Sequence, residues 1–365
     1  MRISLSKLLC LFLMLSSSLL GDVALDADGN LSFFGRARLR FEQDNDTNPQ
    51  VESRTRMRIG NFAGLKYSNQ QNWELAVRGR LGDRRDSRVV DMTVYTKEDY
   101  SYGQRGGFAD QYYLRFWQDD TEFTLGRANM PFWMNTEKLW DEDLTPLGAA
   151  MTTQVGEGSN PIQISLGSFH MPDGLEHFHA WMHAAQLTWT QTGNEWNWQW
   201  AVALYERPGE GGARYLPLGQ DTRDYLFAVL SAKYGGQLHG KAAYVGFDLF
   251  ENLESYSADD PNAFTRTFRN ETTGYALAFN WGGNRKQGDW RFRYVFARVE
   301  GLGAMSSYAT TSFGWLLKSN VQVHDMRADY SITDDWKVTG RISPAQEIIG
   351  DRKSTRYRID FSRSF

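Results

Sequence analysis

The sequence predicts an all-β fold, a transmembrane antiparallel β-barrel of about 16 strands, and three features of the chain indicate it. Apolar and polar side chains alternate with a period of two over nearly the whole chain. Short turns and long loops alternate between these segments. Tryptophan and tyrosine gather beside the short turns. Together these features favour a closed sheet in a membrane over a soluble sheet protein.

Composition limits the class of protein. The chain has 365 residues, 40 of them basic and 44 acidic, with a formal net charge of −4 and 14% aromatic residues. Abundant aromatic residues and balanced charges exclude disorder, and the single cysteine excludes a disulfide scaffold. At a pI of about 5.9 no nucleic-acid partner is expected. Beyond residue 21 no apolar run approaches the roughly 20 residues that a spanning helix needs.

Residues 1–21 are predicted to be a signal peptide. Arg2 and Lys7 precede the apolar stretch Leu8–Leu15, and small residues lead to Gly21. This order of basic start, apolar centre and cleavage site is typical of secretory signals. The apolar run is too short for a membrane anchor. Residues 22–365 are then expected to form one barrel in the outer membrane of a Gram-negative cell.

The period of two is clearest in the strand predicted over residues 33–42. Apolar residues occupy the odd positions from Phe33 to Phe41, and charged residues occupy the even positions from Arg36 to Glu42. The pattern recurs near residues 73–81, 196–204, 275–281, 290–296 and 357–365. A soluble β-sandwich would alternate too, but its strands would be shorter and its apolar face would pack on a second sheet.

The connections between strands distinguish these two architectures. Short turns are predicted at Ser68–Asn72, Gln118–Asp120, Gly156–Pro161, Gln191–Glu195, Gly235–Gln237, Gly282–Asp289 and Thr333–Asp335. Long loops are predicted near 43–52, 83–107, 128–146, 169–177, 206–223, 251–269, 300–318 and 344–354. This layout is typical of outer-membrane barrels, with short periplasmic turns and long extracellular loops. A closed sheet also gives every backbone group a partner within hydrocarbon.

Aromatic residues mark one end of the predicted barrel. Tyr67 and Trp73 flank one short turn, and Trp281 and Trp290 flank another. Rings at one level around a barrel form the girdle at the membrane interface. The chain ends on Phe365, in step with the apolar residues of its last strand. This ending resembles the strand that such barrels present to the barrel assembly machinery. That machinery, outer-membrane lipid and lipopolysaccharide are therefore expected partners.

Basic residues are predicted to line one arc of the lumen. A barrel of about 16 strands is wide enough for a water-filled channel, and its last strand closes against its first. The predicted basic ladder is Arg36, Arg38, Arg40, Arg54, Arg56, Arg58, Arg78, Arg80, Arg341, Arg356 and Arg358. Such a ladder would draw anions and orient dipolar solutes. The alternative is that these arginines are solvated and paired with acids, as in any polar interior.

The third long loop, 128–146, is predicted to fold into the barrel and narrow it. The loop carries apolar anchors and an acidic tip of three residues, Asp141, Glu142 and Asp143. Acids that face the arginine arc would create a transverse field across the constriction. The alternative is a surface loop whose acids are solvated.

The same loop carries a resemblance to a known family. The run Trp140–Gly148 resembles the Trp-Asp-x-Asp-Leu-x-Pro-x-Gly stretch of a family of proteobacterial porins. The segment Met326–Asp335 is similar to that family's penultimate hairpin, and the arginine-rich start of the mature chain is similar too. The resemblance implies a porin fold and passive transport. It implies no catalytic residues, and it leaves the solute open.

No constellation in the sequence predicts an enzyme, a cofactor or a metal centre. His177, His179 and His183 lie close together and could bind a metal. Their place in a long loop and the strand after it favours a loop and girdle role. Neither a Gly-x-Ser-x-Gly motif nor the His-x-Ser pair of a barrel phospholipase is present.

These patterns favour an outer-membrane porin, a passive diffusion channel for small hydrophilic solutes that prefers anionic or dipolar ones. A homotrimer is the candidate assembly. Three alternatives stay open. The first is a substrate-specific channel for acidic oligosaccharides or organic acids. The others are a barrel enzyme such as a lipase or protease, and a structural or adhesive barrel with a plugged lumen.

Overall fold

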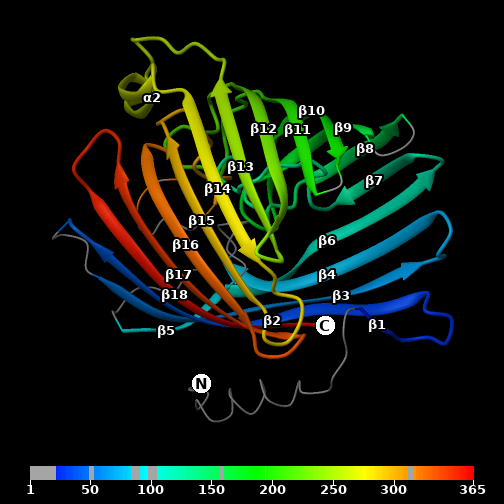
Figure 1. Cartoon of the computed structure of the whole chain (residues 1–365). Helices are drawn as coiled ribbons and strands as arrows, with labels where there is room; N and C mark the ends of the chain where they lie inside the picture. The colour runs from blue at the N-terminus through cyan, green and yellow to red at the C-terminus, as the bar shows by residue number, and fades with distance from the viewer. Residues whose placement is uncertain are drawn as a thin grey trace.

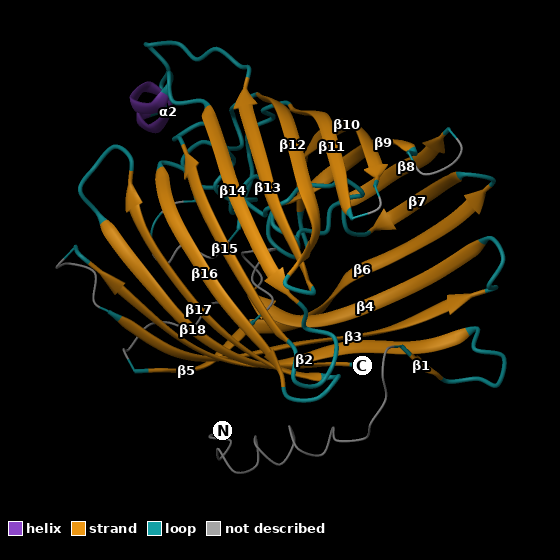
Figure 2. Ribbon diagram, viewed as in Figure 1, coloured by secondary structure: helices purple, strands orange, loops and turns teal. Residues whose placement is uncertain are grey.

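The computed structural model describes residues 22–48, 53–83, 91–97, 105–156, 160–193, 195–310, 316 and 318–365. The predicted signal peptide lies outside them. Over the described residues, Figures 1 and 2 show an all-β barrel with a short helix, α2 (Ala263–Phe268), on a loop. The strands are β1 (Val23–Ala24), β2 (Leu31–Asp46), β3 (Arg54–Ser68), β4 (Trp73–Asp83), β5 (Met92–Thr96), β6 (Arg105–Gln118), β7 (Thr121–Arg127), β8 (Leu147–Val155), β9 (Ile162–Pro172), β10 (Phe178–Thr192), β11 (Trp196–Arg207), β12 (Tyr225–Leu238), β13 (Lys241–Asn252), β14 (Thr273–Gly282), β15 (Trp290–Val299), β16 (Val321–Ser331), β17 (Trp336–Glu347) and β18 (Lys353–Ser364).

Sixteen of these strands, β2–β4 and β6–β18, close into an antiparallel barrel. The last strand closes on the first, because β18 pairs with β2 from Ser354↔Asp46 to Ser364↔Arg36. The two remaining strands are short: β1 pairs with the start of β2, and β5 pairs with β3 within the connection from β4 to β6. The predicted fold class and strand number are confirmed.

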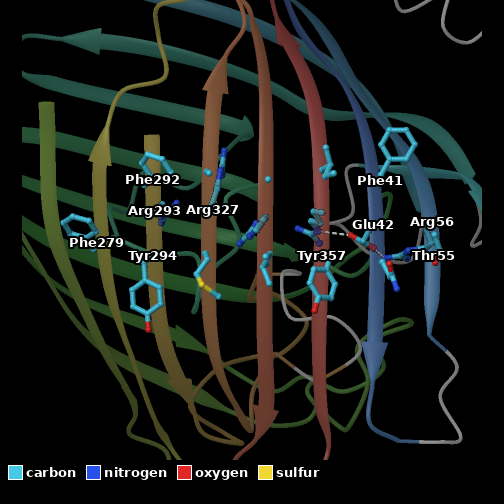
Figure 3. A pocket seen from close by; sticks show the side chains of 18 residues that line it. Phe41, Glu42, Thr55, Arg56, Phe279, Phe292, Arg293, Tyr294, Arg327 and Tyr357 are labelled. Carbon is cyan, nitrogen blue, oxygen red and sulfur yellow. Dashed lines mark hydrogen bonds and ion pairs between the residues drawn. The ribbon is translucent and has the colours of Figure 1, made fainter. Parts of the chain in front are cut away.

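The two faces of the strands differ as the alternation predicts. On β14, Leu277 is 45% exposed, whereas its neighbours Ala276 and Ala278 are almost fully buried. Figure 3 shows the same alternation on β15, where Phe292 and Tyr294 lie on one face and Arg293 on the other. The large apolar side chains therefore cover the outside of the barrel, as a wall in contact with lipid requires. Among the described residues, no helix is long and apolar enough to cross a membrane.

Three of the predicted connections need correction. The turn predicted at Gly235–Gln237 is wrong, because β12 continues to Leu238 and the turn is His239–Gly240. Both turn residues have positive φ, as a two-residue hairpin turn requires. Gly236 stays in the strand, where the ring of Trp196 covers it. The loops predicted as long near 169–177 and 344–354 are also shorter, because β9, β17 and β18 extend into them.

Clusters of aromatic rings lie beside the short turns, on the outer face of the barrel. The rings of Trp196 and Trp198 lie 4.7 and 4.2 Å from the ring of Tyr234. The rings of Trp290 and Tyr330 lie 4.8 Å apart, beside other short turns. This is the arrangement that an interfacial girdle needs.

The C-terminal residue completes the seam of the barrel. Phe365 and Gly35 exchange two backbone hydrogen bonds of 2.6 and 3.0 Å, and the Phe365 ring stacks on Phe33 at 5.5 Å. Gly35 leaves the space for this ring, because a Cβ there would lie 2.6 Å from it and 2.8 Å from the carbonyl oxygen of Phe62. The seam therefore depends on a glycine opposite a terminal aromatic residue.

We predict that Gly35→Val weakens barrel closure by about 1–3 kcal/mol, because the added methyl groups overpack the Phe365 ring. The measurement is the fraction of refolded protein that keeps the fast electrophoretic mobility of an unheated barrel. Gly340→Ala is the control, since a Cβ there meets no atom within 4 Å. An equal loss of refolded barrel in both variants would contradict the role of Gly35 in the seam.

Candidate functional site

The predicted arginine ladder lies on five adjacent strands, β17, β18, β2, β3 and β4. Cross-strand pairing brings its members side by side: Arg341 lies opposite Arg358, and Arg40 lies opposite Arg58. Four more arginines extend the arc and were not included in the predicted ladder. They are Arg291, Arg293, Arg327 and Arg127. Alternation with outward apolar residues is the signal that could have found Arg291, Arg293 and Arg327, whereas Arg127 follows Gly126, which has a positive φ, and breaks the alternation.

Acids on the same wall pair with most of this ladder. Asp360 binds Arg40 at 2.7 Å, and Asp110 binds Arg78 at 2.5 Å. Asp91, just before β5, lies 2.6 Å from Arg38. Further pairs join Asp44 to Arg54 and Arg356, Glu42 to Arg56 and Arg358, Asp325 to Arg341, and Asp329 to Arg291 and Arg327. Buried charges need such partners, so the arc carries far less net charge than its arginines suggest.

The loop 128–146 lies inside the barrel and binds the wall opposite the arc. Asp248 on β13 accepts hydrogen bonds from the backbone N–H of Asn135 at 3.1 Å and from the Thr136 hydroxyl at 2.7 Å. Gln186 on β10 accepts from the backbone N–H of Trp133 at 2.7 Å and donates to its carbonyl oxygen at 2.8 Å. These contacts fix the loop across the lumen.

An apolar core fills the space between this loop and the wall. The ring of Trp140 lies 5.4 Å from Tyr205 on β11 and 5.9 Å from Phe227 on β12. Leu139 and Leu144 of the same loop are fully buried. Polar faces were predicted to line the lumen throughout, but on this side the inward face is largely apolar. The interior is therefore divided into a largely apolar side and a charged side.

The described part of a second loop, between β15 and β16 (residues 300–310), also folds inward, which the sequence pattern does not indicate. Its residues Leu302, Met305 and Tyr308 are buried. Tyr308 accepts a hydrogen bond from the backbone N–H of Asp141 at 2.8 Å. Thr310 donates to the carbonyl oxygen of Glu137 at 3.0 Å. The second loop thus holds the first loop in place from the long-loop end.

The two loops and the arc enclose a charged cavity of about 120 Å³. We call this cavity the eyelet. Its arginines are Arg36, Arg38, Arg40, Arg58, Arg327, Arg341 and Arg358, and its acids are Asp91, Glu137, Asp141, Glu142, Asp143 and Asp360. The remaining predicted ladder members, Arg54, Arg56, Arg78, Arg80 and Arg356, do not line it. Opposite charges on facing walls produce a transverse field.

The acidic side of the eyelet differs from the predicted tip. Asp141 is buried, and its Oδ1 accepts the backbone N–H of Asp143 at 3.0 Å, so it shapes the loop. Glu137 lines the eyelet although the prediction omitted it. Among the described residues, Glu142 and Asp143 make no side-chain ion pair. The charge of Glu137, burial and the charge of Asp143 together raise the pKa of Glu142 to about 7.

The three histidines do not converge on one another. The Nε2 of His177 lies 3.1 Å from Arg214, and the ring of His183 stacks beside Trp181. His179 has an unpartnered buried Nε2. Within the part of the chain that the structure describes, no group of three or more His, Cys, Asp or Glu is arranged to hold a metal.

Solved structures of outer-membrane porins share this fold. OprB of Pseudomonas putida shares the fold with a TM-score of 0.58 and 11% identity, over 93% of this chain and 95% of that one. OccK9 of Pseudomonas aeruginosa has a TM-score of 0.52 and 12% identity over 92% and 99%. OccAB4 of Acinetobacter baumannii has a TM-score of 0.51 and 9% identity, over 92% of this chain and 98% of that one. No protein-family model and no curated protein matches the sequence.

We predict that Asp248→Ala loosens the inward loop, because each hydrogen bond to this carboxylate is worth about 1.5–3 kcal/mol. The expected result is a larger and noisier unitary conductance in a planar bilayer. Asp259→Ala is the control, because Asp259 is exposed on the loop between β13 and β14. Wild-type conductance in D248A would show that the apolar core holds the loop without the carboxylate.

Proposed function

We propose that this chain is an outer-membrane porin that lets small hydrophilic solutes diffuse passively, with the eyelet as its constriction. The porin barrel and its structural neighbours support an outer-membrane channel. The observation that carries the proposal is the apposition of seven arginines and six carboxylates around one narrow cavity inside the barrel. A field of this kind aligns dipolar solutes and favours anions modestly.

The size of the eyelet bears on the alternative functions. The cavity of about 120 Å³ is small, which favours small solutes such as organic acids over oligosaccharides. Structural neighbours such as OprB and OccK9 are channel porins, which favours a channel over a barrel lipase or protease.

The location and assembly of the chain follow from the same proposal. The short-turn end faces the periplasm, and the loop that carries α2 faces the exterior. The signal peptide directs export, and the strand that ends at Phe365 is recognised by the barrel assembly machinery. Lipopolysaccharide surrounds the exterior end, and a homotrimer remains the proposed assembly.

We predict that purified protein conducts in discrete steps in a planar bilayer, with chloride favoured modestly over potassium. The double variant E142Q/D143N removes two negative charges from the eyelet and should strengthen this preference roughly threefold. The measurement is the reversal potential in a salt gradient. D259N is the matched control, since it removes one acid outside the barrel lumen.

Two outcomes would contradict this proposal. Absence of step conductance from folded protein would exclude a channel. An unchanged reversal potential in E142Q/D143N would show that ions pass without meeting these carboxylates.

We further predict that ion preference depends on pH. Glu142 has a raised pKa of about 7, so it is ionised above that pH and protonated below it. The anion preference should therefore rise as the pH falls from 8 to 6, because the eyelet loses one negative charge. E142Q should show the low-pH preference at every pH in this range. If the anion preference of E142Q changed with pH as much as that of the wild type, the titrating group would be another residue.

A further inference from the structure

Both walls of the eyelet present charges that the barrel itself does not use. Most arginines of the arc form ion pairs with acids of the wall, but Arg36 does not. Among the described residues its guanidinium has no ion pair or hydrogen bond, and it rests 5.0 Å from the Phe62 ring. Arg36 lies on β2, on the same face as Arg38 and Arg40, whose guanidinium groups bind Asp91 and Asp360. One cationic group is thus left free to bind a solute.

The facing loop presents the complementary charges. Glu142 and Asp143 form no side-chain ion pair or hydrogen bond with any described residue. Among the described residues, the side chain of Glu137 accepts one hydrogen bond, from the Thr310 hydroxyl at 3.4 Å. Arg36, Glu142 and Asp143 line the same cavity, and the charges of both acids act on Arg36. Carboxylates this close together repel one another, so a cationic group between them would be stabilised.

We infer that the eyelet is a binding subsite for small zwitterions, solutes that carry a carboxylate and an ammonium group a few bonds apart. This inference rests on the proposed function and names the solute class of the same site. The carboxylate of the solute binds the guanidinium of Arg36. Its ammonium group binds the carboxylates of Glu142 and Asp143. Charge-assisted hydrogen bonds of this kind are about twice as strong as neutral ones.

The geometry favours a zwitterion over a singly charged solute. An anion at Arg36 would lie across the cavity from the uncompensated acids of the loop, and a cation at the acids would lie across from Arg36. A zwitterion neutralises both walls at once. The narrow cavity of about 120 Å³ favours a small zwitterion over a large one.

The test measures block of the potassium chloride current by small solutes in planar bilayers at low salt and pH 8, where Glu142 is ionised. The probes are glycine, acetate, methylammonium and glycolamide, which are similar in size and carry both charges, one charge or none. We expect glycine to half-block the wild-type current at a concentration at least about tenfold below that of the other three.

Variants assign this block to the two walls. R36Q and E142Q/D143N should each raise the half-blocking concentration of glycine about tenfold, and R36K should keep most of the wild-type affinity. R269Q and D259N are controls that remove one exposed charge each outside the barrel lumen. Electrophoretic mobility without heating checks that each variant is folded.

The outcomes separate this inference from the proposed function. Block by glycine no stronger than by glycolamide, or unchanged in R36Q and E142Q/D143N, would overturn the zwitterion subsite. Equal block by acetate or by methylammonium would overturn it too, in favour of a site for one charge. In each of these cases the wild-type channel still conducts. Failure of the channel itself would appear as no current before any solute is added.

Discussion

Pairing of backbone hydrogen-bonding groups around a closed sheet is the constraint on which the rest of the structure depends. A strand edge in hydrocarbon would leave N–H and C=O groups without partners, and the pairing of β18 with β2 removes that edge. Closure also fixes which face of each strand meets lipid. The apolar residues turn outward, so the alternate positions must fill or line the interior. Phe365 and Gly35 complete this seam with a ring placed over a glycine.

Charges inside a closed wall follow a second constraint. Arginines that face the interior need counter-charges, and the same alternation supplies them from neighbouring strands, as with Asp360 beside Arg40. Acids of the wall therefore neutralise most of its positive charge. The charges that can interact with solutes belong to a few groups without such partners, chiefly Arg36 and the loop acids. The lumen was predicted to be broadly basic. In the structure, the unpaired charges instead produce a field that is confined to the eyelet.

The inward loops divide the interior into two environments. Trp140 and its apolar neighbours pack against Tyr205 on β11 and Phe227 on β12, while the arginine arc lines the charged eyelet. Asp248 joins the two regions, because it sits on the apolar wall and binds the loop that carries the eyelet acids. The eyelet is thus held by ordinary core packing on one side and by charge on the other.

Local periodicity was enough to predict the strand pattern, the outward apolar face and the arginine-bearing strands, because a period of two is visible along any single strand. The positions of Arg36 and Arg40 on one face follow from that period alone. Register across strands is not local, so the partners of Arg40, which are Asp91 and Asp360, needed the folded chain. The same holds for Glu137, for the second inward loop and for the buried position of Asp141. Each of these depends on contacts between segments more than a hundred residues apart or on loop conformation, for which the sequence has no periodic signal.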